Sequence, residues 1–238
     1  MRILVGDKHL FFDIEGPELV MADNKLRRLP TLILLHGAPG NSDHSVFKPA
    51  FSALRHVCRI VYLDISGAGR SEDPPDDVFS LERWADDIVE FCRLLEIEKP
   101  IVLGVSGGGF IAMVYGIRHP DHAGGLVLAS TQATLDVERS IAEFKRLGGD
   151  EAEAAAREFL KIRVDAESTQ AFGEKCMSVY NTTPQPTRES IIFRPKLAMA
   201  FHSLQGTWHT MDLRDELSKI TAPTLVLTGD QDPVTPLQ

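Results

Sequence analysis

A serine framed by glycines is the residue with the clearest chemical potential in this chain. Residues 104–108 read Gly-Val-Ser-Gly-Gly, between an apolar run at 101–103 and a second one at 110–114. A buried strand that turns sharply into a helix around one serine forms a nucleophile elbow, in which side chains at Gly104 and Gly108 would collide. The serine backbone is strained, and the hydroxyl is exposed where it can attack a carbonyl. The elbow, residues 104–108, makes Ser106 the candidate nucleophile, although a glycine-rich turn around an ordinary serine has the same local pattern.

A second loop can supply the electrostatic part of such a reaction. Residues 36–40, His-Gly-Ala-Pro-Gly, directly follow the apolar run 31–35. Acyl transfer builds negative charge on the carbonyl oxygen, so the site needs two backbone N–H donors aimed at it. We expect Gly107 to offer one donor and Ala38 in this oxyanion loop, residues 36–40, to offer the other. Glycine and proline also mark plain turns, but two such loops after buried strands favour the oxyanion hole.

A carboxylate follows a third apolar run. Residues 224–228 read as a buried strand, and Gly-Asp-Gln-Asp-Pro follows at 229–233. A carboxylate at this place can orient a histidine base. We predict that Asp232 has this role and that Asp230 is the competing residue, while turn formation alone would also explain both.

The elements that position these residues alternate between apolar strands and amphipathic helices, which indicates a doubly wound α/β fold. The clearest helix is predicted over residues 80–95, with Trp84 on its buried face. From 131 to 218 the strand signal gives way to helix formers, which predicts an all-helical insertion, here called the lid. The proline-bearing stretch 182–186 is expected to divide the lid at a hinge or surface turn. The predicted organisation is a core over 1–130, the lid over 131–218, and the continued core over 219–238.

With these motifs in place, the chain resembles α/β-hydrolases of the proline iminopeptidase (prolyl aminopeptidase) type. The resemblance implies a mostly parallel sheet with a helical lid, and a cofactor-free Ser-His-Asp hydrolase of amide or ester bonds. In that arrangement Ser106 points into a cavity between sheet and lid, and Asp232 faces the same cavity. Esterases, lactonases and C–C hydrolases share these motifs, so the substrate stays open. The matching stretches are residues 36–40, 61–64, 67–71, 102–110, 118–120, 126–130 and 222–233.

The chain departs from the family in three places. Ala38 stands where the family usually has glycine, which is tolerable because the donor is a backbone N–H. Ile65-Ser66 stands where a basic residue is usual, a change expected at the floor of the pocket. No histidine follows Asp232, where the family places its base. We therefore expect the C-terminal strand and helix to be missing from this sequence and the enzyme to be damaged or incomplete; a base supplied by His202 or His209 of the lid is the alternative.

An aminopeptidase must also bind the substrate's ammonium group, which in this family acidic lid residues do. Glu143, Glu174 and Glu189 are the possible anchors, but a solvated helix face explains each equally well. Trp208 is the only tryptophan in the lid, where proline iminopeptidases carry a tryptophan-rich motif. The expected partner is a small-molecule or short-peptide substrate. The alternatives are a small-molecule esterase or lactonase, and a non-catalytic ligand-binding protein of the same fold.

Composition limits the remaining classes of function. A chain of 238 residues with 43% hydrophobic and 25% charged residues can bury one sizeable core. The net charge of −9 argues against a nucleic-acid partner. No apolar run approaches the roughly 20 residues of a membrane span, and the N-terminus has too short a run for a signal peptide. The scattered Cys58, Cys92 and Cys176 have no metal-like spacing, so we expect buried thiols in a reducing cytoplasm and no metal.

Overall fold

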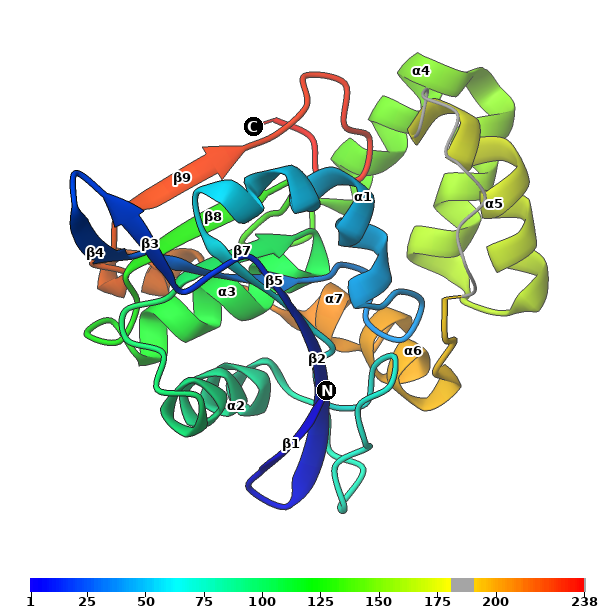
Figure 1. The fold of residues 1–238 in the computed structure, drawn as a ribbon. Coiled ribbons are helices and arrows are strands. Elements are labelled where there is room, and N and C mark those ends of the chain that lie inside the picture. Colours follow the sequence, from blue (N-terminus) through cyan, green and yellow to red (C-terminus); the bar gives the residue numbers. More distant parts are fainter. Residues whose placement is uncertain (181–190, 238) are drawn as a thin grey trace.

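The computed structural model describes residues 1–180 and 191–237, and the predicted hinge at 182–186 lies outside them. Helices and strands alternate from the last of five consecutive strands, β5 (Thr31–Leu35), to α4 (Val137–Arg157), and a run of helices follows (Figure 1). The label η marks short 3₁₀ helices and, for η3, a π-helix. The elements are β1 (Arg2–Val5), β2 (Lys8–Glu15), β3 (Leu19–Ala22), β4 (Lys25–Arg28), β5 (Thr31–Leu35), η1 (His44–Phe47), α1 (Lys48–Phe51), η2 (Ser52–His56), β6 (Arg59–Leu63), α2 (Leu81–Leu94), β7 (Ile101–Val105), α3 (Gly107–Arg118), β8 (Gly125–Ala129), α4 (Val137–Arg157), η3 (Glu158–Ile162), α5 (Ala166–Tyr180), α6 (Pro195–His202), α7 (Thr207–Thr210), η4 (Arg214–Lys219) and β9 (Thr224–Leu227).

The central sheet brings the predicted loops to one edge. Within the described residues it has seven strands in the order β1-β2-β6-β5-β7-β8-β9. Strands β5 to β9 run parallel, whereas β2 is antiparallel to both β1 and β6. The carboxyl ends of β5, β7, β8 and β9 therefore lie side by side, which is where ligands bind in open α/β sheets. The predicted α/β-hydrolase fold, with its mostly parallel sheet, is confirmed.

Alternation along the strands divides the core between the two faces of the sheet. Ile33, Val61 and Val102 pack in a large cluster with the apolar faces of α2 and α3. Their neighbours Leu34, Ile60 and Leu103 point the other way, into a smaller cluster with Phe47 and Cys58. Successive side chains of a strand point to opposite faces, so a continuous apolar run is what a sheet covered on both faces requires.

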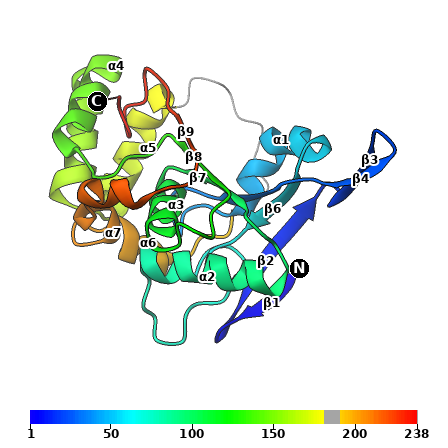
Figure 2. The same ribbon diagram turned by 90° about the vertical axis from the view of Figure 1, so that its left-hand side faces the viewer.

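Helices fill the chain between β8 and β9, as expected for the lid. Helices α4 and α5 pack along each other at one end of the molecule, opposite the projecting β3–β4 hairpin (Figures 1 and 2). Helix α4 is interrupted at Gly149, whose φ of 74° is not helical. The division of the chain at 130 and 218 stays a prediction.

The expectation that residues 224–228 form a buried strand is half wrong. The strand exists as β9, parallel to β8, but Leu225, Val226 and Leu227 are 53%, 64% and 48% exposed. Strand β9 is the last strand of the described sheet and has β8 as its only strand neighbour. An apolar run reports a preference for burial, and burial itself needs another element to cover the run.

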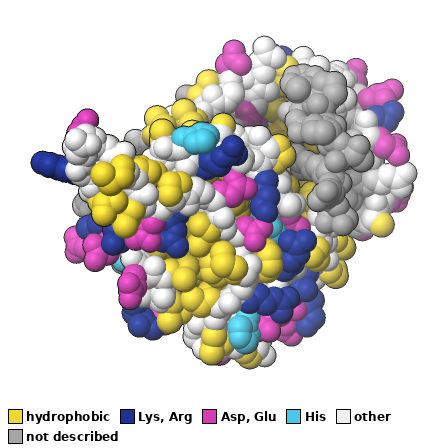
Figure 3. All heavy atoms as spheres, viewed as in Figure 1, with side chains coloured by type: hydrophobic (Ala, Val, Ile, Leu, Met, Phe, Trp, Pro, Cys, Tyr) yellow, Lys and Arg dark blue, Asp and Glu magenta, His cyan; other side chains and the backbone are white. Residues whose placement is uncertain are grey.

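The buried thiols agree with the compositional analysis, and the surface shows how the charges are distributed. Acidic and basic side chains are interspersed on the face shown in Figure 3, with no basic stripe. None of the described helices is long and apolar enough to cross a lipid bilayer. Cys58, Cys92 and Cys176 are free and buried, as predicted. Burial raises the pKa of Cys92 to about 12 and that of Cys176 to about 11, so these thiols stay protonated at neutral pH.

The start of α2 offers a local test of the fold. Ser80 is the N-cap in an extended conformation, and its hydroxyl accepts a hydrogen bond from the Arg83 N–H at 3.2 Å. Replacing Ser80 with alanine leaves that donor without its partner, and we expect a loss of about 1 kcal/mol in the free energy of unfolding. Urea denaturation measures the effect, with the exposed Ser178 of α5, replaced by alanine, as control. Equal stability of the two variants would show that the cap contributes nothing.

Candidate active site

The turn around Ser106 has the geometry of a nucleophile elbow. Ser106 lies between the end of β7 and the first residue of α3, with φ 53° and ψ −121°, a conformation that non-glycine residues rarely adopt. A Cβ atom on Gly104 would lie 2.2 Å from the Gly108 oxygen, and one on Gly108 would lie 2.2 Å from the Leu35 oxygen. Both glycines are therefore required by backbone atoms that cannot move aside, as the sequence predicts.

The oxyanion loop lies directly against this turn. A Cβ on Gly37 would come within 2.9 Å of the Ser106 Cβ, and a Cβ on Gly107 would come within 2.8 Å of the Pro39 ring. Ala38 has a left-handed φ of 44°, so the loop turns sharply beside the serine. Gly107 begins α3, and the first N–H groups of a helix have no partner within it and carry partial positive charge. Both candidate donors are thus close to the serine that they would serve.

A threonine that the sequence analysis missed holds the elbow from the other side. The Thr131 hydroxyl donates to the Ser106 carbonyl oxygen at 2.8 Å, and the Ser106 N–H donates to the Ala129 oxygen at 3.0 Å. The Thr131 side chain also fills the space that a Cβ on Gly109 would need, at 2.4 Å. The signal was present, because Thr131 is the second residue after the carboxyl end of β8, at the sheet edge where Ser106 follows β7.

Asp232 is held by its own loop. Its carboxylate accepts hydrogen bonds from the Val234 and Thr235 N–H groups at 2.9 Å and from the Thr235 hydroxyl at 2.8 Å. A carboxylate has about four acceptor positions, so one is left for a base. Asp230 is exposed and accepts no such hydrogen bonds from the described residues, which favours Asp232 as the candidate acid. The Asp-Pro-Val-Thr sequence, typical of a side-chain-stabilised turn, is the signal that could have pointed to Thr235.

One strand separates the candidate nucleophile from the candidate acid. Ser106 follows β7 and the loop of Asp232 follows β9, with β8 between them. Neighbouring strands are about 4.8 Å apart, so these two strand ends are about 10 Å apart, which leaves space for an imidazole between the side chains. Among the described residues, Asp232 lines a cavity of about 380 Å³ with Ser130, Tyr180 and residues 229–231, and Ser106 is not part of that lining.

The lid histidines do not complete a triad. The Nε2 atom of His209 lies 2.9 Å from the Leu160 oxygen, and the ring of His202 packs edge-on against Phe201 and Trp208. Burial lowers the pKa of His202 to about 4, and its Nε2 has no hydrogen-bond partner among the described residues. In the part of the chain that the structure describes, no histidine is hydrogen-bonded to Ser106 or Asp232.

Two of the three acidic lid residues, Glu143 and Glu174, lie on helix faces that solvent reaches. Glu143 pairs with Arg146 one turn along α4, at 2.7 Å. Glu174 is exposed and accepts a hydrogen bond from Gln170 at 2.8 Å. Glu189 lies outside the described residues. For Glu143 and Glu174, the structure favours the reading as surface charges over the reading as ammonium anchors.

One buried cluster has the composition of a metal site. Asp43, His44 and Asp64 bring their possible ligand atoms within 4.8 Å of one another. The Asp64 carboxylate already accepts from the N–H and Nδ1 of His44 at 2.7 and 2.9 Å, and from the Arg70 N–H at 2.9 Å. Three of the roughly four acceptor positions of Asp64 and the Nδ1 atom of His44 are thus used within the protein. The hydrogen bonds of the cluster join the loops that carry Asp64, His44 and Arg70.

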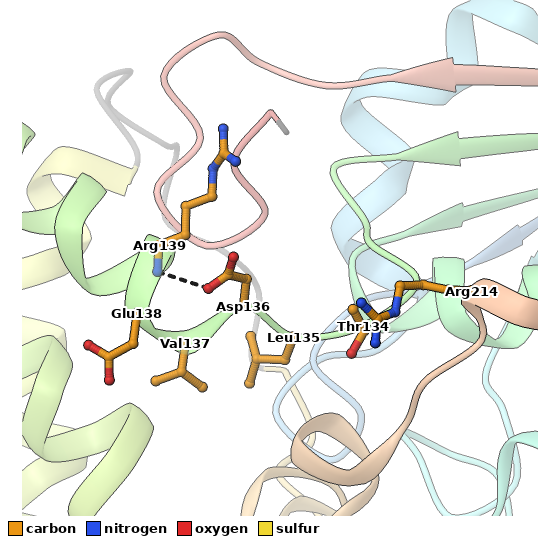
Figure 4. A pocket seen from close by; sticks show the side chains of 7 residues that line it. All are labelled: Thr134, Leu135, Asp136, Val137, Glu138, Arg139 and Arg214. Atoms are coloured by element: carbon orange, nitrogen blue, oxygen red, sulfur yellow. Dashed lines mark hydrogen bonds between the residues drawn. The ribbon is translucent and has the colours of Figure 1, made fainter.

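A larger open cavity at the start of the lid lacks such chemistry. It has a volume of about 480 Å³, and its lining includes Asp136, Arg139 and Arg214 (Figure 4). Asp136 caps α4 by accepting from the Arg139 N–H at 3.1 Å, and the Arg139 guanidinium donates to the Leu237 oxygen. Arg214 pairs with Asp212. The polar groups are satisfied within the protein, and the lining contains no candidate nucleophile.

Comparison with known proteins places the chain in a family. The sequence model of the family described as alpha/beta hydrolase fold matches residues 30–238. The chain belongs to this family. The relatives compared with it below are hydrolases.

The individual relatives differ from one another in activity. The chain is 29% identical over 223 residues to a proline iminopeptidase of Lactobacillus helveticus, covering 87% of this chain and 76% of that one. It is 26% identical over 228 residues to 3-oxoadipate enol-lactonase 1 of Acinetobacter baylyi, covering 96% and 77%. The crystal structure of a proline iminopeptidase of Mycobacterium smegmatis superposes with a TM-score of 0.71 at 20% identity, covering 98% and 82%. The relatives support a hydrolase and leave the bond that is cleaved open.

Proposed function

We propose that the protein is a serine hydrolase of amide or ester bonds in which Ser106 is the nucleophile. The observation that carries the proposal is the left-handed backbone of Ser106 at the tip of the β7–α3 turn, with the oxyanion loop packed against it. Backbone strain of this kind persists only where the surrounding structure enforces it, and it is typical of active sites.

In the proposed reaction, the Ser106 hydroxyl attacks the substrate carbonyl and an acyl-enzyme forms. The Ala38 and Gly107 N–H groups stabilise the negative charge on the carbonyl oxygen. Asp232 orients an imidazole base that takes the serine proton and returns it to the leaving group. None of the described residues places an imidazole between Ser106 and Asp232, so the described residues by themselves give slow chemistry.

For the substrate, we propose the release of N-terminal residues, most like a proline iminopeptidase. The 29% identity with the Lactobacillus helveticus enzyme supports this specificity. A small-molecule esterase or lactonase is the second candidate. It is favoured by the enol-lactonase relative and by the surface positions of Glu143 and Glu174, which leave no described lid carboxylate assigned to a substrate amine.

A comparison of three compounds on the same protein tests these alternatives. If the specificity is that of an iminopeptidase, a free prolyl amide is cleaved and its N-acetyl analogue is not, because the acylated nitrogen cannot pair with a carboxylate. An esterase or lactonase does not require a free amine, and it prefers a neutral ester or lactone. Competition against hydrolysis of an activated ester measures binding of each compound even where turnover is slow.

Two results would change the proposal. Preference for the neutral compounds, with no response to the prolyl amide, transfers it to the esterase or lactonase. A protein that binds one of the three compounds without cleaving any, with or without added imidazole, is instead a ligand-binding member of the family.

A further inference from the structure

One lid segment is fastened to the oxyanion loop and to the loop that follows it. The Arg194 N–H donates to the Gly40 oxygen at 2.8 Å, and the Ile192 N–H donates to the Asp43 carboxylate at 3.1 Å. Asp43 is buried, which raises its pKa, but hydrogen bonds from Ser45 and from the Ile192 N–H hold that pKa below its ordinary value. These bonds join positions about 150 residues apart in the chain, at the exit of the loop that carries Ala38.

The Arg194 side chain extends the attachment across a third loop. Its Nε donates to the Gly67 oxygen at 3.1 Å, and its Nη2 donates to the Ser71 oxygen at 3.2 Å and to the Asp73 carboxylate at 2.8 Å. The rigid fork of a guanidinium can satisfy such acceptors together, whereas the single ammonium of a lysine cannot match their geometry. Arg194 is 30% exposed, so water screens only part of this interaction.

Helix α6 then runs from the oxyanion loop to the start of α3. Its first turn packs so closely on Gly40, which has a φ of +85°, that a Cβ there would lie 2.3 Å from the Ala198 N atom. At its other end, the Phe201 ring lies 2.9 Å from the place where a Cβ on Gly107 would be, and stacks on Phe110 at 6.0 Å. Helix α6 therefore touches the loop of Ala38 and the start of α3 together.

We propose that residues 192–201 form a brace that fixes the distance between the Ala38 and Gly107 N–H groups, and that Arg194 is the positioning residue that fastens it. The inference rests on the proposed hydrolase function for its effect on rate, but the attachment itself is independent of chemistry. Removing one oxyanion donor outright costs about 10²–10³ in kcat, so displacing one costs a part of that.

The matched control is the ion pair of Lys196, which lies in the first turn of α6, two residues after the N-cap Arg194. The Lys196 ammonium pairs with Asp77 at 3.0 Å, but both side chains are more than half exposed, and the hydrogen bonds described for this pair do not involve the oxyanion loop. The experiment compares Arg194→Ala, Arg194→Lys and Lys196→Ala with the unmodified 238-residue chain. The readouts are kcat and KM for p-nitrophenyl acetate, and amide hydrogen exchange of residues 36–47.

With the brace loosened by Arg194→Ala, we expect kcat to fall about tenfold, KM to stay within about twofold, and exchange in residues 36–47 to rise about tenfold. Arg194→Lys should fall between this variant and the unmodified protein, and Lys196→Ala should match the unmodified protein. A purely structural role would lower stability without separating kcat from KM. If Arg194→Ala behaves like Lys196→Ala in both readouts, the proposal is overturned.

Two other outcomes can be told apart from failure of the brace: absence of hydrolase activity, and failure of a variant to fold. Faster exchange of residues 36–47 in a protein that hydrolyses no ester supports the brace and counts against the hydrolase. If Arg194→Ala does not fold, Arg194→Lys and Asp73→Asn replace it. Exchange unchanged in both of those variants overturns the proposal.

Discussion

Ser106→Ala is expected to reduce hydrolysis of an activated ester to the rate of the solution reaction plus what the oxyanion donors contribute. The left-handed φ of 53° is retained, and only the attacking hydroxyl is lost. In a serine protease with a complete triad, losing the serine costs about 2 × 10⁶ in kcat. The expected loss here is smaller, because no described histidine is hydrogen-bonded to Ser106 and the unmodified protein is therefore itself expected to react slowly. Steady-state kinetics, together with mass spectrometry of a serine-directed covalent probe, measure both effects.

Added imidazole should increase the difference in rate between the unmodified protein and Ser106→Ala. The cavity of about 380 Å³ beside Asp232 can admit a free imidazole, and Asp232 has an acceptor position left to orient it. We expect imidazole to raise the rate of the unmodified protein in a saturable way and to leave Ser106→Ala at the background rate of imidazole itself. Ser178→Ala is the control, because Ser178 is exposed on α5 and is not among the described residues that line this cavity. Equal rates for Ser106→Ala and the unmodified protein would remove Ser106 from the mechanism.

The second large effect is on stability, at Gly108. Gly108→Ala places a Cβ 2.2 Å from the Leu35 oxygen and 2.8 Å from the His36 oxygen, which are backbone atoms of β5 and of the oxyanion loop. Neither can retreat without disturbing the sheet, so we expect a loss of about 3 kcal/mol or more in the free energy of unfolding. Urea denaturation followed by circular dichroism measures it. The elbow also moves relative to the oxyanion loop, so any ester hydrolysis should fall as well.

Gly173 provides a control for which the opposite change in the free energy of unfolding is expected. It lies on the exposed face of α5, and a Cβ there would meet nothing within 4 Å. Gly173→Ala should therefore stabilise the protein by about 0.5–1 kcal/mol, because glycine is a poor residue inside a helix. A Gly108→Ala variant as stable as Gly173→Ala would mean that the tight packing of the elbow against β5 is wrong.

Local sequence motifs predicted most of the fold. Apolar runs at 31–35 and 101–103 locate β5 and β7, and the amphipathic pattern of 80–95 locates α2. The same holds for the elbow, because Gly104 and Gly108 are demanded by atoms only a few residues away or in the adjacent strand. Such features depend on periodicity and on the sterics of short segments, which the order of residues expresses directly.

The candidate site is divided between what the sequence by itself determined and what the tertiary structure decided. Sequence determined which residues follow the strand ends, and so named Ala38, Ser106, Gly107 and Asp232. It could not show that β8 separates Ser106 from Asp232, or that β9 is exposed despite its apolar residues, because strand order and covering elements are set by contacts across the sheet. It also missed Arg194, which fastens the lid to Gly40 and Gly67 over more than 120 positions of chain. A long-range contact produces no periodic pattern in the sequence, because its two residues interact only after the chain has folded and brought them together.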